Sequence, residues 1–117
     1  MKTINHNESA LQQVCLKWFK LQYPHHVIFA IPNGGKRGKT EAAIMKSEGV
    51  LAGVADAFIM YPKGRFCGLF IEFKSEKGRQ SLSQKLFKDK AEISGYKYII
   101  VRSIDQFIEA IKMYFNC

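Results

Sequence analysis

Cysteine and histidine are scarce in this sequence, and their spacing excludes two common ways of stabilising a small domain. The three cysteines, Cys15, Cys67 and Cys117, are odd in number and lie far apart, which fits neither a disulfide framework nor a CxxC zinc site. The three histidines show no HxxxH or HExxH spacing, so they do not predict a zinc centre. We therefore expect reduced thiols and a function that depends on other residue types.

Long hydrophobic runs, repeats and low-complexity linkers are also missing. The longest uncharged apolar runs, such as residues 27–32, fall far short of the roughly 18 residues that cross a bilayer. Residues 1–10 are polar and no apolar segment follows them, so no signal peptide is predicted. With 117 residues, 47% of them hydrophobic, we expect one domain over residues 1–117, located in the cytoplasm and without a membrane partner.

Acidic residues are outnumbered, 10 against 18 Lys and Arg, which gives a net charge of +8. Residues 32–46 hold four cations and one acid, and residues 73–90 hold six cations and two acids, so these two windows account for nearly all of the excess. Clustered cations favour a phosphate-rich partner, although two solvated basic surfaces are the alternative interpretation.

Helix-type and strand-type patterns alternate along the chain. Helices are predicted over residues 5–23, 40–48, about 81–95 and from 103 onward, and strands over 26–31, 53–61, 66–74 and 96–102. The predicted apolar stripe of the first helix consists of Leu11, Val14, Cys15, Trp18 and Leu21. The order α-β-α-β-β-α-β-α predicts an α/β fold in which helices flank a mixed sheet.

Two acids, Asp56 and Glu72, lie in strands that are otherwise apolar. Charged groups are seldom buried unless they are paired or bound to a metal ion. The alternation of side chains along a strand puts Glu72 and Lys74 on one face, where a simple ion pair is the alternative interpretation.

Asp56 joins that face only in one register of the hairpin. A four-residue loop, 62–65, separates Asp56 and Glu72 onto opposite faces, whereas a three-residue loop, 63–65, sets them opposite each other. We expect the second register, or a bulge that compensates for the first. Two carboxylates this close raise each other's pKa unless a divalent cation lies between them.

Glu8 lies on the apolar stripe of the first predicted helix, three residues before Leu11. If that helix packs near Asp56, then Glu8 becomes a third acid at the site. Otherwise it is an acid in a first helical turn, where it favours the helix dipole.

The order and spacing of these motifs resemble a known nuclease family. The segments are Glu8, Pro32-Asn33-Gly34-Gly35-Lys36-Arg37, Gly49, Gly53-Val54-Ala55-Asp56, Ile71-Glu72-Phe73-Lys74 and Ser83-Gln84, with fifteen residues between Asp56 and Glu72. Together they resemble the virus-type replication-repair nuclease (VRR-NUC) domain of the PD-(D/E)xK superfamily, over most of the chain. One departure is Ala55, which stands where the family usually has proline.

The resemblance implies a metal-dependent DNA endonuclease with a restriction-endonuclease-like core. Small members of the family are similar to Holliday-junction resolvases and are often dimeric, so we expect a homodimer that acts on branched or flapped DNA in replication, repair or recombination. Glu8 would support a site for Mg²⁺ or Mn²⁺, directly or through water.

The remaining roles are carried over to matching positions. The resemblance implies that Asp56 and Glu72 hold the metal ion together with the backbone carbonyl of Phe73. Lys74 would orient or activate the attacking water, and Gln84 would position the lysine or a phosphate.

Basic and glycine-rich segments supply the expected contacts to the DNA backbone. These residues are Asn33, Gly34, Gly35, Lys36, Arg37, Lys39, Lys77, Arg79 and Lys85. Two other functions stay open: a non-catalytic basic nucleic-acid-binding module whose core acids form a structural ion network, and an RNA-directed or resolvase-type enzyme of the same superfamily.

Overall fold

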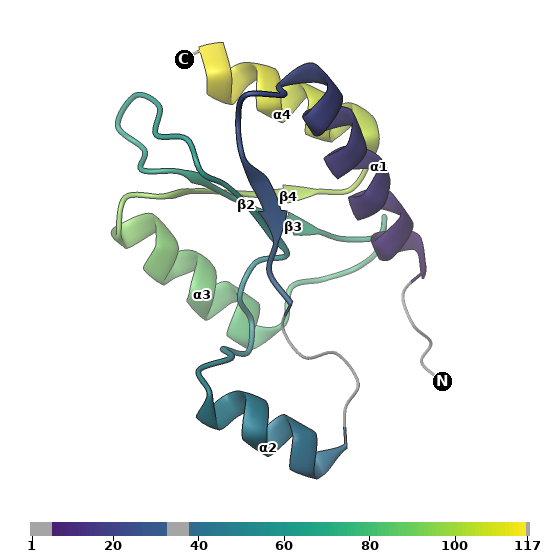
Figure 1. The fold of residues 1–117 in the computed structure, drawn as a ribbon, viewed down its shortest axis with the longest axis vertical. Coiled ribbons are helices and arrows are strands. Elements are labelled where there is room, and N and C mark those ends of the chain that lie inside the picture. The colour runs from purple at the N-terminus through teal and green to yellow at the C-terminus, as the bar shows by residue number, and fades with distance from the viewer. Residues whose placement is uncertain (1–5, 33–37, 117) are drawn as a thin grey trace.

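The chain folds into a four-stranded sheet with helices on both faces (Figure 1). The structure is a computed structural model that describes residues 6–32 and 38–116. Its elements are α1 (His6–Gln22), β1 (Ile28–Ala30), α2 (Lys39–Ser47), β2 (Ala57–Ile59), β3 (Leu69–Phe73), α3 (Leu82–Ile93), β4 (Lys97–Val101) and α4 (Ile104–Asn116). This order confirms the predicted α-β-α-β-β-α-β-α fold.

The strands lie side by side in the order β1-β2-β3-β4. The β1–β2 and β2–β3 pairs are antiparallel, whereas β3 and β4 are parallel and are joined through α3. Helices α1 and α4 cover one face of the sheet and α3 covers the other, as Figure 1 shows. In the part of the chain that the structure describes, no helix is long and apolar enough to cross a membrane.

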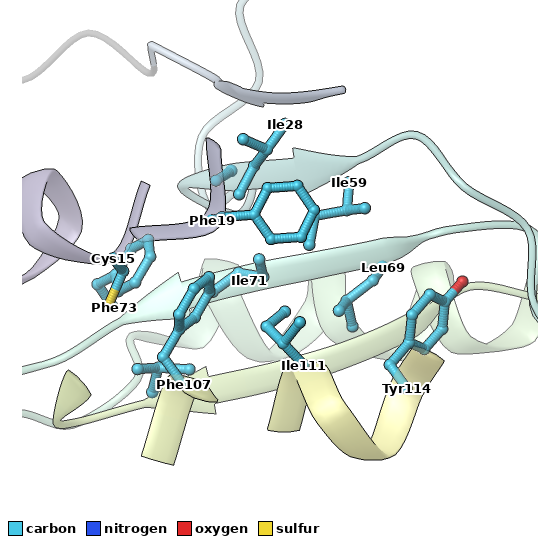
Figure 2. Close-up of a cluster of buried hydrophobic side chains, with 12 residues drawn as sticks. Cys15, Phe19, Ile28, Ile59, Leu69, Ile71, Phe73, Phe107, Ile111 and Tyr114 are labelled. Atoms are coloured by element: carbon cyan, nitrogen blue, oxygen red, sulfur yellow. The ribbon is translucent and has the colours of Figure 1, made fainter. Parts of the chain in front are cut away.

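The hydrophobic core fills the space between the sheet and the α1–α4 pair (Figure 2). Phe19 from α1, Ile71 from β3 and Phe107 from α4 are fully buried there. The stripe predicted for α1 is wrong in part, because Val14 and Leu21 are exposed. The helix is rotated so that the large Phe19 ring faces the core, and this rotation leaves Val14 and Leu21 facing solvent.

The β2–β3 hairpin has the register that the sequence predicted. Ala57 pairs with Ile71 as the last pair of the ladder. The adjacent Asp56 donates its N–H to the Ile71 carbonyl at 3.0 Å and accepts from the Phe73 N–H at 2.7 Å, so it lies next to Glu72. Glu72 contacts Gln84 on the face of the sheet that α3 covers, and the Asp56 carboxylate interacts with Glu72 there.

The tip of this hairpin differs from the predicted three-residue loop. Lys63 and Phe66 bond to each other in both directions, at 3.0 and 2.9 Å, around a two-residue turn in which Gly64 has a φ of +59°. This tip is offset by one residue from the strands below it. Between the strands and the tip, the Tyr61 N–H donates to the Ile59 carbonyl two residues earlier at 3.0 Å, the contact of a γ-turn.

Candidate active site

Asp56, just before β2, and Glu72, on β3, are called the acid pair below, and Lys74 lies beside them just after β3. Glu72 is only 2% exposed and Lys74 only 8%. The Phe73 N–H donates to Asp56 Oδ2 at 2.7 Å, which ties Asp56 to the strand that carries Glu72. Lys74 Nζ lies 3.7 Å from Glu72 Oε2. The structure thus brings together the three charged residues that the sequence singled out.

Tyr98 holds the other oxygen of Glu72 and was missed by the sequence analysis. Its hydroxyl donates to Glu72 Oε1 at 3.2 Å and accepts from Gln80 Nε2 at 3.1 Å. Tyr98 lies on β4, directly opposite Phe70 in the parallel register. Nothing local in residues 96–102 signals this contact, because it depends on how β3 and β4 pair.

Gln84 has two functions at the start of α3. Its Oε1 accepts from the Ser81 N–H at 2.8 Å, which completes a capping box, while its Nε2 donates to Glu72 Oε2 at 2.8 Å. The amide therefore contacts Glu72; its role in positioning Lys74 or a phosphate, which the resemblance implies, stays a prediction. The first turn of α3 is tied directly to the acid pair.

Gly53 explains how the segment before Asp56 approaches α3 so closely. Its φ is +86°, and a Cβ atom at this position would lie 2.4 Å from the backbone of Ser83. Only glycine tolerates this conformation and this contact. Steric crowding against α3 therefore explains why position 53, three residues before Asp56, is glycine.

Burial dominates the electrostatics of the acid pair. Burial and the charge of Asp56 raise the pKa of Glu72 to about 7, against the lowering effect of Lys74. Burial also raises the pKa of Asp56, opposed first by the Phe73 N–H donor, and the Glu8 charge raises it further. Both carboxylates are thus costly to ionise without a compensating cation.

Glu8 approaches the site from the first turn of α1. Its Oε2 accepts from the Ser75 N–H at 3.1 Å, just beyond Lys74. Across residues 6–32 and 38–116, no three Asp, Glu, His or Cys side chains group closely enough to hold a metal ion. The donor set is therefore the acid pair and nearby backbone oxygens, with Glu8 as a neighbour.

The expected DNA-contacting cations that can be placed are all exposed. They are Lys39 on α2, Lys77 and Arg79 after β3, and Lys85 on α3. The loop residues Asn33, Gly34, Gly35, Lys36 and Arg37 lie outside the described residues. Lys85 directly follows Gln84, the residue of α3 that contacts Glu72.

Comparison with solved structures finds chains with a similar architecture. A chain described as a "VRR_NUC domain protein" superposes with a TM-score of 0.76 at 27% identity, covering 97% of this chain and 90% of that chain. A chain described as a "VRR_NUC domain" superposes with a TM-score of 0.63 at 17% identity, covering 92% and 97%, and shows the fold alone. No family model and no curated protein matches the sequence.

Proposed function

We propose that this chain, which shares the fold of the solved VRR_NUC domain structures, is a divalent-metal-dependent endonuclease that hydrolyses phosphodiester bonds in DNA. The observation that carries the proposal is the acid pair, with Glu72 buried and Asp56 half-buried, beside the buried Lys74 in a protein of net charge +8. We propose branched or flapped DNA, including Holliday junctions, as the substrate, and a homodimer as the acting form, because symmetric cutting of two strands requires two sites.

The chemistry of the donor set fits Mg²⁺ or Mn²⁺. These hard cations prefer carboxylate and carbonyl oxygens and keep several waters, so the acid pair with the backbone carbonyl of Phe73 is a sufficient protein contribution. Burial and mutual repulsion raise the pKa of Glu72 to about 7, and a bound cation would remove this penalty. Glu8, held at the Ser75 N–H, would support the site directly or through water.

The protein's own residues then prepare the reaction. When bound, the metal ion supplies Lewis-acid stabilisation of the phosphoryl oxygens and makes a water more acidic. The Lys74 ammonium, beside Glu72, orients the attacking water and stabilises charge that develops on the phosphate. Gln84 and Tyr98 each fix one oxygen of Glu72, which keeps the carboxylate in one orientation.

One observation favours a second function, a non-catalytic nucleic-acid-binding module. Throughout the described segments, every buried side-chain nitrogen or oxygen has a hydrogen-bond partner. Glu72 already pairs with Lys74. In this case the acids form a structural ion network and bind no metal ion.

A cleavage panel separates the two functions. The substrates are plasmid, linear duplex, flap, splayed arm and four-way junction, each with Mg²⁺ or Mn²⁺ and then with EDTA. Asp56→Asn and Lys74→Met are expected to lose at least about 100-fold in cleavage rate and to retain DNA binding. Glu41→Gln, which changes an exposed acid on α2, is the matched control and should cut like the wild type.

Other outcomes contradict parts of the proposal. Wild-type protein that cuts nothing in the presence of metal ions removes the nuclease function, and normal cutting by either site variant removes the site assignment. Calorimetry that detects no divalent-cation binding, with or without DNA, supports the binding module. A strict monomer in light scattering, with and without DNA, contradicts the homodimer.

A further inference from the structure

The backbone that follows Lys74 forms a tight turn over residues 75–78, called the 75–78 turn below. The Gly78 N–H donates to the Ser75 carbonyl at 3.1 Å. Arg102 Nη1 donates to the carbonyls of Ser75 at 2.8 Å and Gly78 at 2.6 Å. The Glu76 carbonyl lies 3.4 Å from the same nitrogen. One guanidinium group thus holds both ends of the turn.

Arg102 is itself fixed at the junction of β4 and α4. The backbone N–H of Arg102 donates to Gln106 Oε1 at 2.7 Å. The backbone N–H of Gln106 donates to Ser103 Oγ at 3.1 Å. Among residues 6–32 and 38–116, Arg102 forms no ion pair with a carboxylate. The charged guanidinium group therefore binds the carbonyl oxygens of the turn, and hydrogen bonds from a charged donor are stronger than those from a neutral donor.

Glu8 also holds this turn, from the first turn of α1. Its Oε2 accepts from the Ser75 N–H at 3.1 Å and lies only 3.2 Å from the position that a Cβ atom on Gly78 would occupy. An anion on an N–H group and a cation on carbonyl groups are complementary, so the two side chains clamp the turn from α1 and β4.

This clamp bears directly on Lys74. The Lys74 N–H donates to the Val101 carbonyl at 3.0 Å, one residue before Arg102, and Ser75 follows Lys74 in the chain. We propose that Arg102 is a positioning residue: it fixes the 75–78 turn and thereby the backbone from which Lys74 reaches Glu72. The expected effect of Arg102 on cleavage rests on the proposed nuclease function. The clamp itself rests only on the hydrogen bonds of Arg102 and Glu8 to the turn.

Arg102→Met and Arg102→Lys test the clamp, with Arg65→Met as a matched control that removes an exposed arginine at the hairpin tip. Amide hydrogen exchange of metal-free protein is measured first, by NMR. In Arg102→Met, the Ser75 and Gly78 amides should exchange at least about tenfold faster, while the β3 amides stay protected. Arg102→Lys should restore only part of the protection, because an ammonium lacks the planar fork of donors.

Cleavage supplies the second measurement. In Arg102→Met, kcat should fall at least about tenfold because Lys74 is displaced. The calorimetric affinity for Mg²⁺ should stay within about twofold of wild type, since Arg102 does not contact the acid pair. The control should match the wild type in all three measurements.

Unchanged exchange at the turn in Arg102→Met overturns the inference, as does unchanged kcat with faster exchange. Equal loss of protection across the whole sheet also overturns it, because Arg102 would then contribute only general stability. If the wild type shows no metal-dependent cleavage, then the proposed function fails. Exchange at the turn then decides alone whether Arg102 holds it.

Discussion

Glu72→Gln, studied in metal-free protein, tests the electrostatics of the acid pair. Burial and the Asp56 charge disfavour the ionised form, so the pKa of Glu72 is raised from 4.5 to about 7. Below pH 4.5 the carboxyl is protonated in the folded and unfolded chains alike, and its contribution to stability is fully present. As the pH rises toward 7, the unfolded chain releases the proton while the folded chain keeps it. Stability therefore falls across this interval.

The size of this effect follows from the two pKa values. One pKa unit corresponds to about 1.4 kcal/mol, so the change from 4.5 to about 7 lowers the free energy of unfolding by up to about 3 kcal/mol once the pH exceeds 7. Because small domains have only about 5–15 kcal/mol in total, such a loss is readily measured. Glutamine keeps the shape of the side chain and cannot ionise, so it should remove the part of the pH dependence that Glu72 contributes, while Asp56, whose pKa is also raised by burial, keeps its own.

Urea unfolding in EDTA at pH 5 and pH 8 measures the difference. The wild type and the control Glu41→Gln should lose about 2–3 kcal/mol more between these pH values than Glu72→Gln does. Added Mg²⁺ should stabilise the wild type more at pH 8 than at pH 5, because it binds the ionised pair. Equal pH dependence in the wild type and Glu72→Gln would refute this account of the site.

Three further substitutions or modifications test packing around the site. Gly53→Ala should lower the free energy of unfolding by more than about 2 kcal/mol, because a Cβ atom there would lie 2.4 Å from the α3 backbone; Gly38→Ala, which meets open space, should change it by less than about 1 kcal/mol in the same thermal melts. Tyr98→Phe removes a donor to the acid pair and should cost about 1–3 kcal/mol in urea unfolding; no loss would mean that this hydrogen bond is unimportant. Cys15 is fully buried, with its pKa raised to about 12 by burial, so peptide mass spectrometry should find it unmodified by iodoacetamide at pH 8 while the exposed Cys67 reacts; equal labelling contradicts this.

Features determined by local chemistry were predictable from the sequence. Ser81 begins α3 as a cap, and Gly95, with a φ of +96°, follows its last turn. The register of the β2–β3 hairpin followed from one requirement, that Asp56 and Glu72 share a face. A shift by one residue would have separated them, so a chemical argument was enough to select the pairing.

Contacts that depend on long-range pairing were not predictable. Tyr98 reaches Glu72 only because β4 pairs in parallel with β3. Nothing in the sequence of the connecting segment indicates the register in which these two strands pair. The sequence predicted Arg102 only as the last residue of a strand. The three carbonyl groups that it contacts lie 24 to 27 residues earlier in the chain. The buried face of α1 was misjudged because the position of Phe19 is settled by packing rather than by periodicity.

The two hydrogen-bond donors to Glu72, Gln84 and Tyr98, have a consequence for the order of folding. The two donors that orient Glu72 come from α3 and β4, 12 and 26 residues further along the chain. The Tyr98 contact spans 26 residues and requires the crossover through α3, so it forms later than the hairpin, whose Ile59–Leu69 pair spans only ten. We therefore expect the hairpin with its two acids to form before the carboxylate is oriented, so that the newly folded chain becomes competent only when the crossover has docked and the first turn of α3 has closed.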